Sequence, residues 1–168
     1  MSSMCSYVMK ARGNKDNVRA FFADIFDGCS AFLIALVDCE EKKLSDGETV
    51  LMVDNYCNGS LEFEFGYQQL INKTAEHQVV FSAESFNDAD EFSENLFFDR
   101  GISLINQTCE YHEFWKDDCE PEEWHAFRHD YNQSGNHYEC DGDCIKVVIS
   151  APEMPDIENY AGITGREM

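Results

Sequence analysis

The segment CSYVMKA at residues 5–11 places apolar side chains at every second position, which is the pattern of a β-strand with one buried face. A turn at Gly13 ends this strand. Apolar residues within Val18–Ile25 then recur at helical spacing, and Asn14 or Asp16 can cap the N-terminus of that helix. The chain therefore opens with a strand that is followed directly by an amphipathic helix.

The rest of the chain contains further runs that are typical of strands, separated by helical patterns. Asn58-Gly59 is a typical hairpin turn and would join two of the strands. Strands are expected at residues 30–38, 49–55, 60–66, 78–84, 102–115 and 144–150. Beyond the first helix, helices are expected at residues 67–76, 87–100 and 121–131. These patterns predict an α+β fold, with a mainly antiparallel sheet and two or three helices packed on it.

Length and composition indicate one domain. With 168 residues, of which 43% are hydrophobic, the chain is expected to fold as a single globular domain over residues 1–150. Residues 109–144 form a part of this domain that is rich in Cys and His. Residues 151–168 contain two of the three prolines, and we expect a loosely ordered acidic tail there. No stretch approaches the ~18 consecutive apolar residues of a membrane span, so no membrane partner is expected.

Charge is the most unusual property of the composition. The chain has 33 Asp and Glu against 12 Lys and Arg, a formal net charge of -21. Solubility of a small domain needs a net charge of magnitude only about 2–8. We therefore interpret the acidity as a surface that competes for basic grooves which hold nucleic acid. The alternative interpretation is an ordinary soluble protein from an acidic proteome.

The carboxylates are concentrated between Glu76 and Glu123. This segment contains fourteen carboxylates and only two cations, Arg100 and Lys116. Duplex DNA carries about one charge per 1.7 Å of its axis, so this density can imitate a phosphate array. The alternative is that these are solvated faces without a partner. The expected contact residues are Glu84, Asp88, Asp90, Glu91, Glu94, Asp99, Asp117, Asp118, Glu120, Glu122 and Glu123.

A cluster of Cys and His near the C-terminus predicts a structural Zn²⁺ site. His125 and His129 are four residues apart on the expected helix, which puts both imidazoles on one face. Cys140 and Cys144 flank a turn, and together the four side chains make a Cys2His2 set. The alternative is that they are solvent-facing helix residues and core thiols. The alternate ligands are His137, Cys119 and His112.

Several short segments resemble a known family. The strand MCSY at residues 4–7, the turn RGNKDNV at residues 12–18, the segment CEYHEFW at residues 109–115 and EEW at residues 122–124 resemble the YubB-like ferredoxin-like proteins. That resemblance implies an α+β fold with helices on one face of an antiparallel sheet. It also implies a plasmid- or phage-borne protein in the cytoplasm of a bacterial host. In that context, the chain is similar in kind to small acidic anti-CRISPR proteins.

These observations predict a non-enzymatic inhibitor of the anti-CRISPR type. Its expected partner is a protein with a basic nucleic-acid-binding groove, such as an RNA-guided CRISPR nuclease, and it would not bind nucleic acid itself. One alternative is a mobile-element α+β protein with an unassigned binding function. Another is a metal-dependent hydrolase, although the sequence has no GxSxG, P-loop, GxGxxG or HExxH motif.

Overall fold

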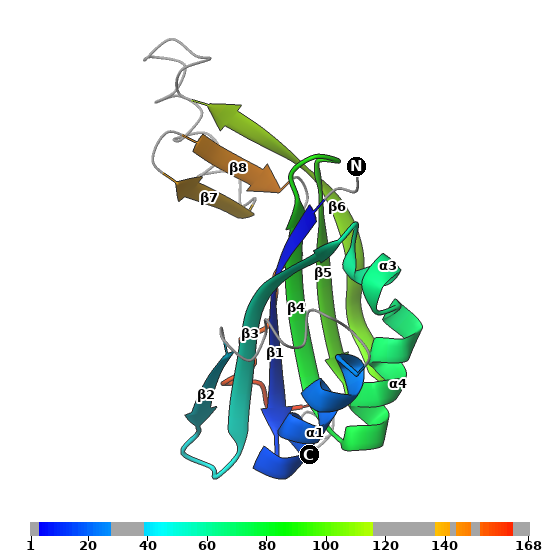
Figure 1. Ribbon diagram of the computed structural model, residues 1–168. Coiled ribbons are helices and arrows are strands. Elements are labelled where there is room, and N and C mark those ends of the chain that lie inside the picture. Colours follow the sequence, from blue (N-terminus) through cyan, green and yellow to red (C-terminus); the bar gives the residue numbers. More distant parts are fainter. Residues whose placement is uncertain (1–3, 28–38, 116–136, 142–143, 149–151, 163–168) are drawn as a thin grey trace.

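The computed structural model describes residues 4–27, 39–115, 137–141, 144–148 and 152–162. Within these residues, eight antiparallel strands form one sheet, in the order β2-β3-β1-β4-β5-β6-β8-β7 (Figure 1). The strands are β1 (Met4–Gly13), β2 (Cys39–Lys43), β3 (Thr49–Asn58), β4 (Val80–Asn87), β5 (Phe92–Asp99), β6 (Ile102–Trp115), β7 (His137–Asp141) and β8 (Cys144–Val148). The helices among the described residues are α1 (Lys15–Ile25), α3 (Leu61–Glu64) and α4 (Tyr67–His77).

The connectivity is that of a ferredoxin-like α+β fold with an extended sheet. Strand β1 pairs antiparallel with both β3 and β4, and β2 pairs antiparallel with β3. Strands β3 and β4 therefore run in the same direction on either side of β1, and α3 and α4 make the connection between them. Strands β5, β6, β8 and β7 extend the sheet beyond β4. The predicted α+β class is confirmed.

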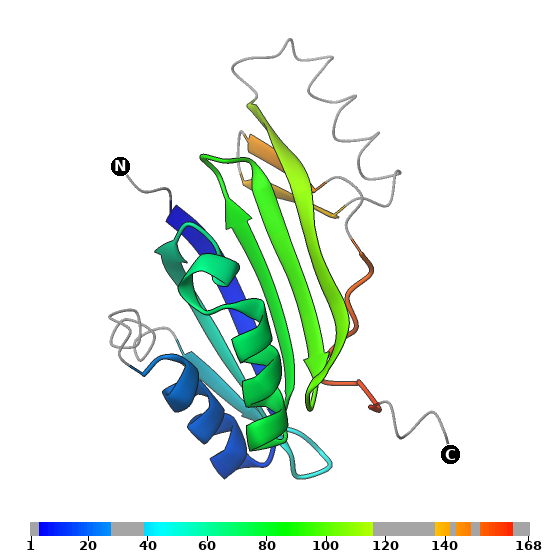
Figure 2. The same cartoon turned by 90° about the vertical axis from the view of Figure 1, so that its right-hand side faces the viewer.

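The main core lies between the sheet and the helices, which cover one face of the sheet (Figure 2). Strand residues reach this face at every second position, as the alternating pattern of residues 5–11 predicts. Phe81 and Phe98 stack there with ring centroids 5.9 Å apart. The largest fully buried side chains on this face are Tyr7, Phe21, Phe26, Phe81, Phe98, Met9, Leu61, Leu70 and Leu96.

A smaller apolar cluster lies on the opposite face of the sheet. Val50, Val80 and Phe97 contact Ile157 there, and Ile157 is 2% exposed. The Arg12 guanidinium donates to the carbonyl oxygens of Ile157 and Glu158 at 2.9 and 2.7 Å. Residues 152–162 thus pack against the sheet, although they belong to the segment 151–168 for which we expected a loosely ordered tail. Its remainder, residues 163–168, lies outside the described residues.

Several expected elements are present with close bounds. Asn14 is the N-cap of α1, and its side chain accepts a hydrogen bond from the backbone of Asp16. Helix α4 matches the expected helix at residues 67–76. Strand β6 has the bounds that the sequence predicts, and β8 occupies most of the expected strand at residues 144–150.

The helix expected at residues 87–100 is wrong. Those residues form the end of β4, a turn and strand β5. Strand β5 is buried on both faces, because Leu96 and Phe98 contact the helix-face core while Phe97 contacts the opposite cluster. A strand that is buried on both faces lacks the alternation of a half-buried strand, and its apolar residues can be mistaken for a helical stripe.

The hairpin expected at Asn58-Gly59 is also wrong. Strand β3 continues to Asn58, and Gly59 has a φ of 74°, which favours glycine. Ser60 then caps α3 by accepting a hydrogen bond from the backbone N–H of Phe63 at 2.9 Å. The chain therefore leaves the sheet at this point and does not return as the strand expected at residues 60–66.

Candidate functional site

One end of the sheet carries a group of exposed carboxylates. The pairs Met4↔Asn58 and Cys5↔Asn87 place the start of β1, the end of β3 and the β4–β5 turn together at this end. The side chain of Asn87 donates to the carbonyl oxygen of Gly59 at 2.7 Å, which brings α3 to the same end. Five exposed residues at this end are called the acidic end below: Glu62, Asp88, Asp90, Glu91 and Glu110.

Apart from Lys146, which pairs with Glu113 of β6, the described cations lie away from the acidic end. Lys10 is the first cation along β1. Arg12 pairs with Val50 and Val80, which places Arg12 at the opposite end of the sheet. In the described part of the chain, β4, β5, β6 and α3 contain no Lys or Arg. This segregation of charge gives the molecule a directed field. The described cations are Lys10, Arg12, Lys15, Arg19, Lys42, Lys43, Lys73, Arg100 and Lys146.

The expected contact residues fall into three groups. Asp88, Asp90 and Glu91 are exposed in the β4–β5 turn, and Glu84 is half-buried. Glu94 and Asp99 are 1% and 2% exposed, so their assignment to a contact surface is corrected. The others lie outside the described residues: Asp117, Asp118, Glu120, Glu122 and Glu123.

Asp99 is buried because its carboxylate is used within the protein. It accepts a hydrogen bond from the guanidinium of Arg100 at 2.6 Å and another from the hydroxyl of Tyr160 at 2.8 Å. The second bond ties β5 to the C-terminal segment on the face opposite the helices. The same contact raises the pKa of Arg100, because the adjacent carboxylate stabilises the charged guanidinium.

Glu94 joins the sheet to α3 on the helix face. Its Oε1 accepts hydrogen bonds from the backbone N–H of Leu61 and from the hydroxyl of Ser85, both at 2.8 Å. Its Oε2 accepts a hydrogen bond from the backbone N–H of Glu62 at 3.2 Å and a short one from the hydroxyl of Tyr67. Four donors from three elements therefore converge on one buried carboxylate.

The Glu94 carboxylate fixes the position of the acidic end. A carboxylate at the first N–H groups of a helix satisfies donors that have no partner within the helix. Here it ties the start of α3 to the middle of the sheet. Burial, and then the hydrogen bond to Glu94, raise the pKa of Tyr67, so the phenol stays protonated as a donor. The sequence did not lead us to this role of Glu94.

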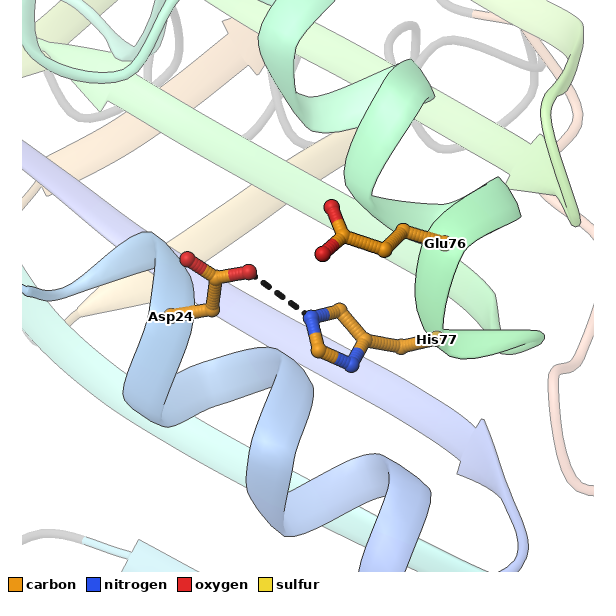
Figure 3. A group of neighbouring side chains, drawn as sticks. All are labelled: Asp24, Glu76 and His77. Carbon is orange, nitrogen blue, oxygen red and sulfur yellow. Dashed lines mark hydrogen bonds and ion pairs between the residues drawn. The ribbon is translucent and has the colours of Figure 1, made fainter.

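A second polar cluster lies between α1 and α4. Asp24, Glu76 and His77 each offer a ligand atom within 4.8 Å of the others (Figure 3). His77 Nε2 lies 2.8 Å from Asp24 Oδ2, and the Lys73 Nζ lies 3.0 Å from a carboxylate oxygen of both Asp24 and Glu76. The lysine ammonium already occupies the position of a counter-ion. This cluster is therefore best described as an ion-pair network that joins the two helices.

This network predicts a pH-dependent contribution to stability. Hydrogen bonds from His77 and Lys73 lower the pKa of Asp24. A group with a lowered folded pKa stabilises the fold above its unfolded pKa and loses that contribution as the pH falls through the folded value. We expect Asp24→Asn to lower the free energy of unfolding by about 1 kcal/mol at pH 7. Urea unfolding at pH 7 and pH 3 should show a smaller difference at pH 3, and an equal difference at both would contradict this.

The predicted Zn²⁺ ligands are only partly within the described residues. His125, His129 and the alternate Cys119 lie outside them. In the backbone pairing of β7 and β8, Cys140 faces Ile145 and Cys144 faces Asp141. The two cysteines therefore occupy neighbouring rungs at the connected end of this strand pair. The alternates His137 and His112 both pair with β8, opposite Val148 and Val147. The zinc site stays a prediction.

Comparison with known proteins gives no relative for this chain. Family models, the curated protein sequences and the solved structures contain no match. The resemblance to the YubB-like proteins stays a prediction. Among the described residues, no helix has the length and apolar character that crossing a membrane requires.

Proposed function

We propose that the protein is a non-enzymatic anti-defence inhibitor of the anti-CRISPR type. In this proposal, the acidic end binds the basic nucleic-acid-binding groove of an RNA-guided nuclease and blocks the loading of target DNA. The observation that supports it is the group of five exposed carboxylates at one end of the sheet, where β4, β5, β6 and α3 contribute no Lys or Arg. A partner of opposite charge would be steered to one end of the molecule.

The β4–β5 turn presents the densest charge of the acidic end. Three of its four residues, Asp88, Asp90 and Glu91, are exposed carboxylates. The turn is held in place, because the side-chain oxygen of Asn87 accepts a hydrogen bond from the backbone N–H of Asp90 at 2.9 Å. Charges that are already fixed before binding lose little conformational entropy in a complex. This favours a role in recognition over a purely solvated surface.

The proposal predicts competition with DNA. The purified protein should reduce target-DNA binding by at least one member of a panel of RNA-guided nucleases loaded with guide RNA. Inhibition should weaken steeply when NaCl rises from about 50 to 200 mM, because contacts between exposed charges are screened. Fluorescence anisotropy of labelled target DNA measures both effects. Binding of the protein to no nuclease in the panel at either salt concentration would contradict the proposal.

A further inference from the structure

Cys5 and Cys57 face each other across two neighbouring strands. They are direct partners in the antiparallel pairing of β1 and β3, and both lie in the helix-face core with 0% and 4% of their surface exposed. Facing residues of an antiparallel pair have Cα atoms about 4.5–5.5 Å apart. A disulfide spans Cα separations of about 4.4–6.8 Å. The backbone therefore already holds these thiols at a separation that a disulfide can bridge.

We propose that Cys5 and Cys57 are a site of reversible oxidation, at which a hydroperoxide converts the two thiols into a disulfide. Both cysteines are free in the structure described here. This inference does not depend on the proposed function, because it rests only on the pairing and the contacts of the two thiols.

The reaction balances with a hydroperoxide as the oxidant. The sulfur of Cys5 attacks the terminal peroxide oxygen, which breaks the O–O bond and gives a sulfenic acid and an alcohol. The sulfur of Cys57 then attacks the sulfenic sulfur, forms the S–S bond and releases water. Two electrons pass from the two thiols to the peroxide. A small thiol reductant reverses the change by thiol–disulfide exchange.

The environment of the pair assigns the two roles. A hydrogen bond from Cys57 lowers the pKa of Cys5, although burial and the nearby Glu94 carboxylate act in the opposite direction. The contact with Cys5, together with burial, raises the pKa of Cys57. Cys5 therefore ionises first and is the attacking sulfur, because the thiolate is the reactive form of cysteine.

The pairing also explains why these two cysteines should react with each other. Of the cysteines in the described strands, only Cys5 and Cys57 are cross-strand partners. Cys39 is exposed but faces Val53 on β3, and Cys109 faces Ser93 on β5. Oxidation of the exposed Cys39 would not yield this internal disulfide.

The disulfide would change the hydrogen bonds that hold α3. In the reduced protein, the Cys57 sulfur lies 3.6 Å from the carbonyl oxygen of Ser60, and the Cys5 sulfur lies 3.9 Å from Glu94 Oε1. Ser60 caps α3, and Glu94 accepts hydrogen bonds from its first N–H groups. Oxidation removes both S–H donors, so it acts directly on the anchor of this helix.

Peptide mapping tests the proposal on the wild-type chain. The folded, reduced protein is treated with hydrogen peroxide, blocked with N-ethylmaleimide in denaturant and digested with trypsin without reduction. Cys5 and Cys57 are the sole cysteines of the tryptic peptides 1–10 and 44–73. We expect these two peptides to be recovered mainly as one linked species, two hydrogen masses below their sum. Dithiothreitol should return them to the separate peptides.

Matched variants complete the test. Cys39→Ser should leave the linked species unchanged, whereas Cys5→Ser and Cys57→Ser should each abolish it. The proposal is overturned if peptides 1–10 and 44–73 carry separate maleimide labels while the peptide that contains Cys39 is oxidised. It is equally overturned if Cys5 links to other cysteines as often as to Cys57. Both outcomes are read from the wild-type chain, so they do not depend on the folding of a variant.

Discussion

Replacing Glu94 with alanine is expected to lower the free energy of unfolding by about 3–5 kcal/mol. The carboxylate is 1% exposed, and it accepts hydrogen bonds from the backbone of Leu61 and Glu62 and from the side chains of Tyr67 and Ser85. Alanine would leave these donors without their acceptor. Each buried donor that loses its partner costs about 1–3 kcal/mol, and partial rehydration of the exposed edge of α3 limits the sum.

Urea unfolding at pH 7 measures this effect, with Glu91→Ala as the control. Glu91 is the same residue type three positions earlier, but it is exposed, and its replacement should change the free energy of unfolding by less than about 0.5 kcal/mol. Glu94→Gln keeps one acceptor oxygen and should fall between the two. A loss below about 1 kcal/mol for Glu94→Ala would show that the carboxylate does not anchor α3.

Much of the architecture follows from local sequence patterns. The alternation at residues 5–11, the Asn14 cap and the long strand Ile102–Trp115 are all present as predicted. These elements have one buried face and clear ends, so local periodicity is sufficient to find them. Strand β5 was missed because both of its faces are buried, by the helices on one side and the C-terminal segment on the other. That covering comes from residues far away in the sequence.

The candidate site shows the same limit. Charge counting correctly places Asp88, Asp90 and Glu91 at the surface, because a turn with three carboxylates has no means of burying them. It fails for Glu94 and Asp99, whose partners come from Leu61 and Tyr160, 33 and 61 residues away. One signal was available: in a strand, Glu94 has the parity of Leu96 and Phe98 and therefore points into the same core.

Neutralising the β4–β5 turn is expected to weaken partner binding about tenfold or more at low salt, which corresponds to at least ~1.4 kcal/mol. The variant Asp88→Asn, Asp90→Asn, Glu91→Gln removes three exposed charges of the acidic end. It keeps side chains of similar size, and it leaves Asn87, which holds the turn, in place. The loss should be largest at low ionic strength, because screening at high salt weakens the contacts that the variant lacks.

A matched control variant distinguishes binding through a local surface from an effect of the overall negative charge. The variant Asp16→Asn, Glu40→Gln, Asp156→Asn changes the net charge equally, at exposed positions outside the acidic end. Asn keeps one acceptor oxygen for the backbone N–H of Glu158 and loses only the hydrogen bond from the Asn159 side chain, so the turn at residues 156–159 should keep its conformation. If the acidity acts only as a diffuse field, both triple variants should lose affinity equally.

The affinities of the two triple variants for the same RNA-guided nuclease, measured side by side at about 50 mM NaCl, test the central claim most directly. We predict that the turn variant loses about tenfold or more and no longer displaces target DNA, while the control stays within about twofold of the wild type. Equal affinities for the wild type and the turn variant would contradict the account and leave the acidic end as a solvated surface.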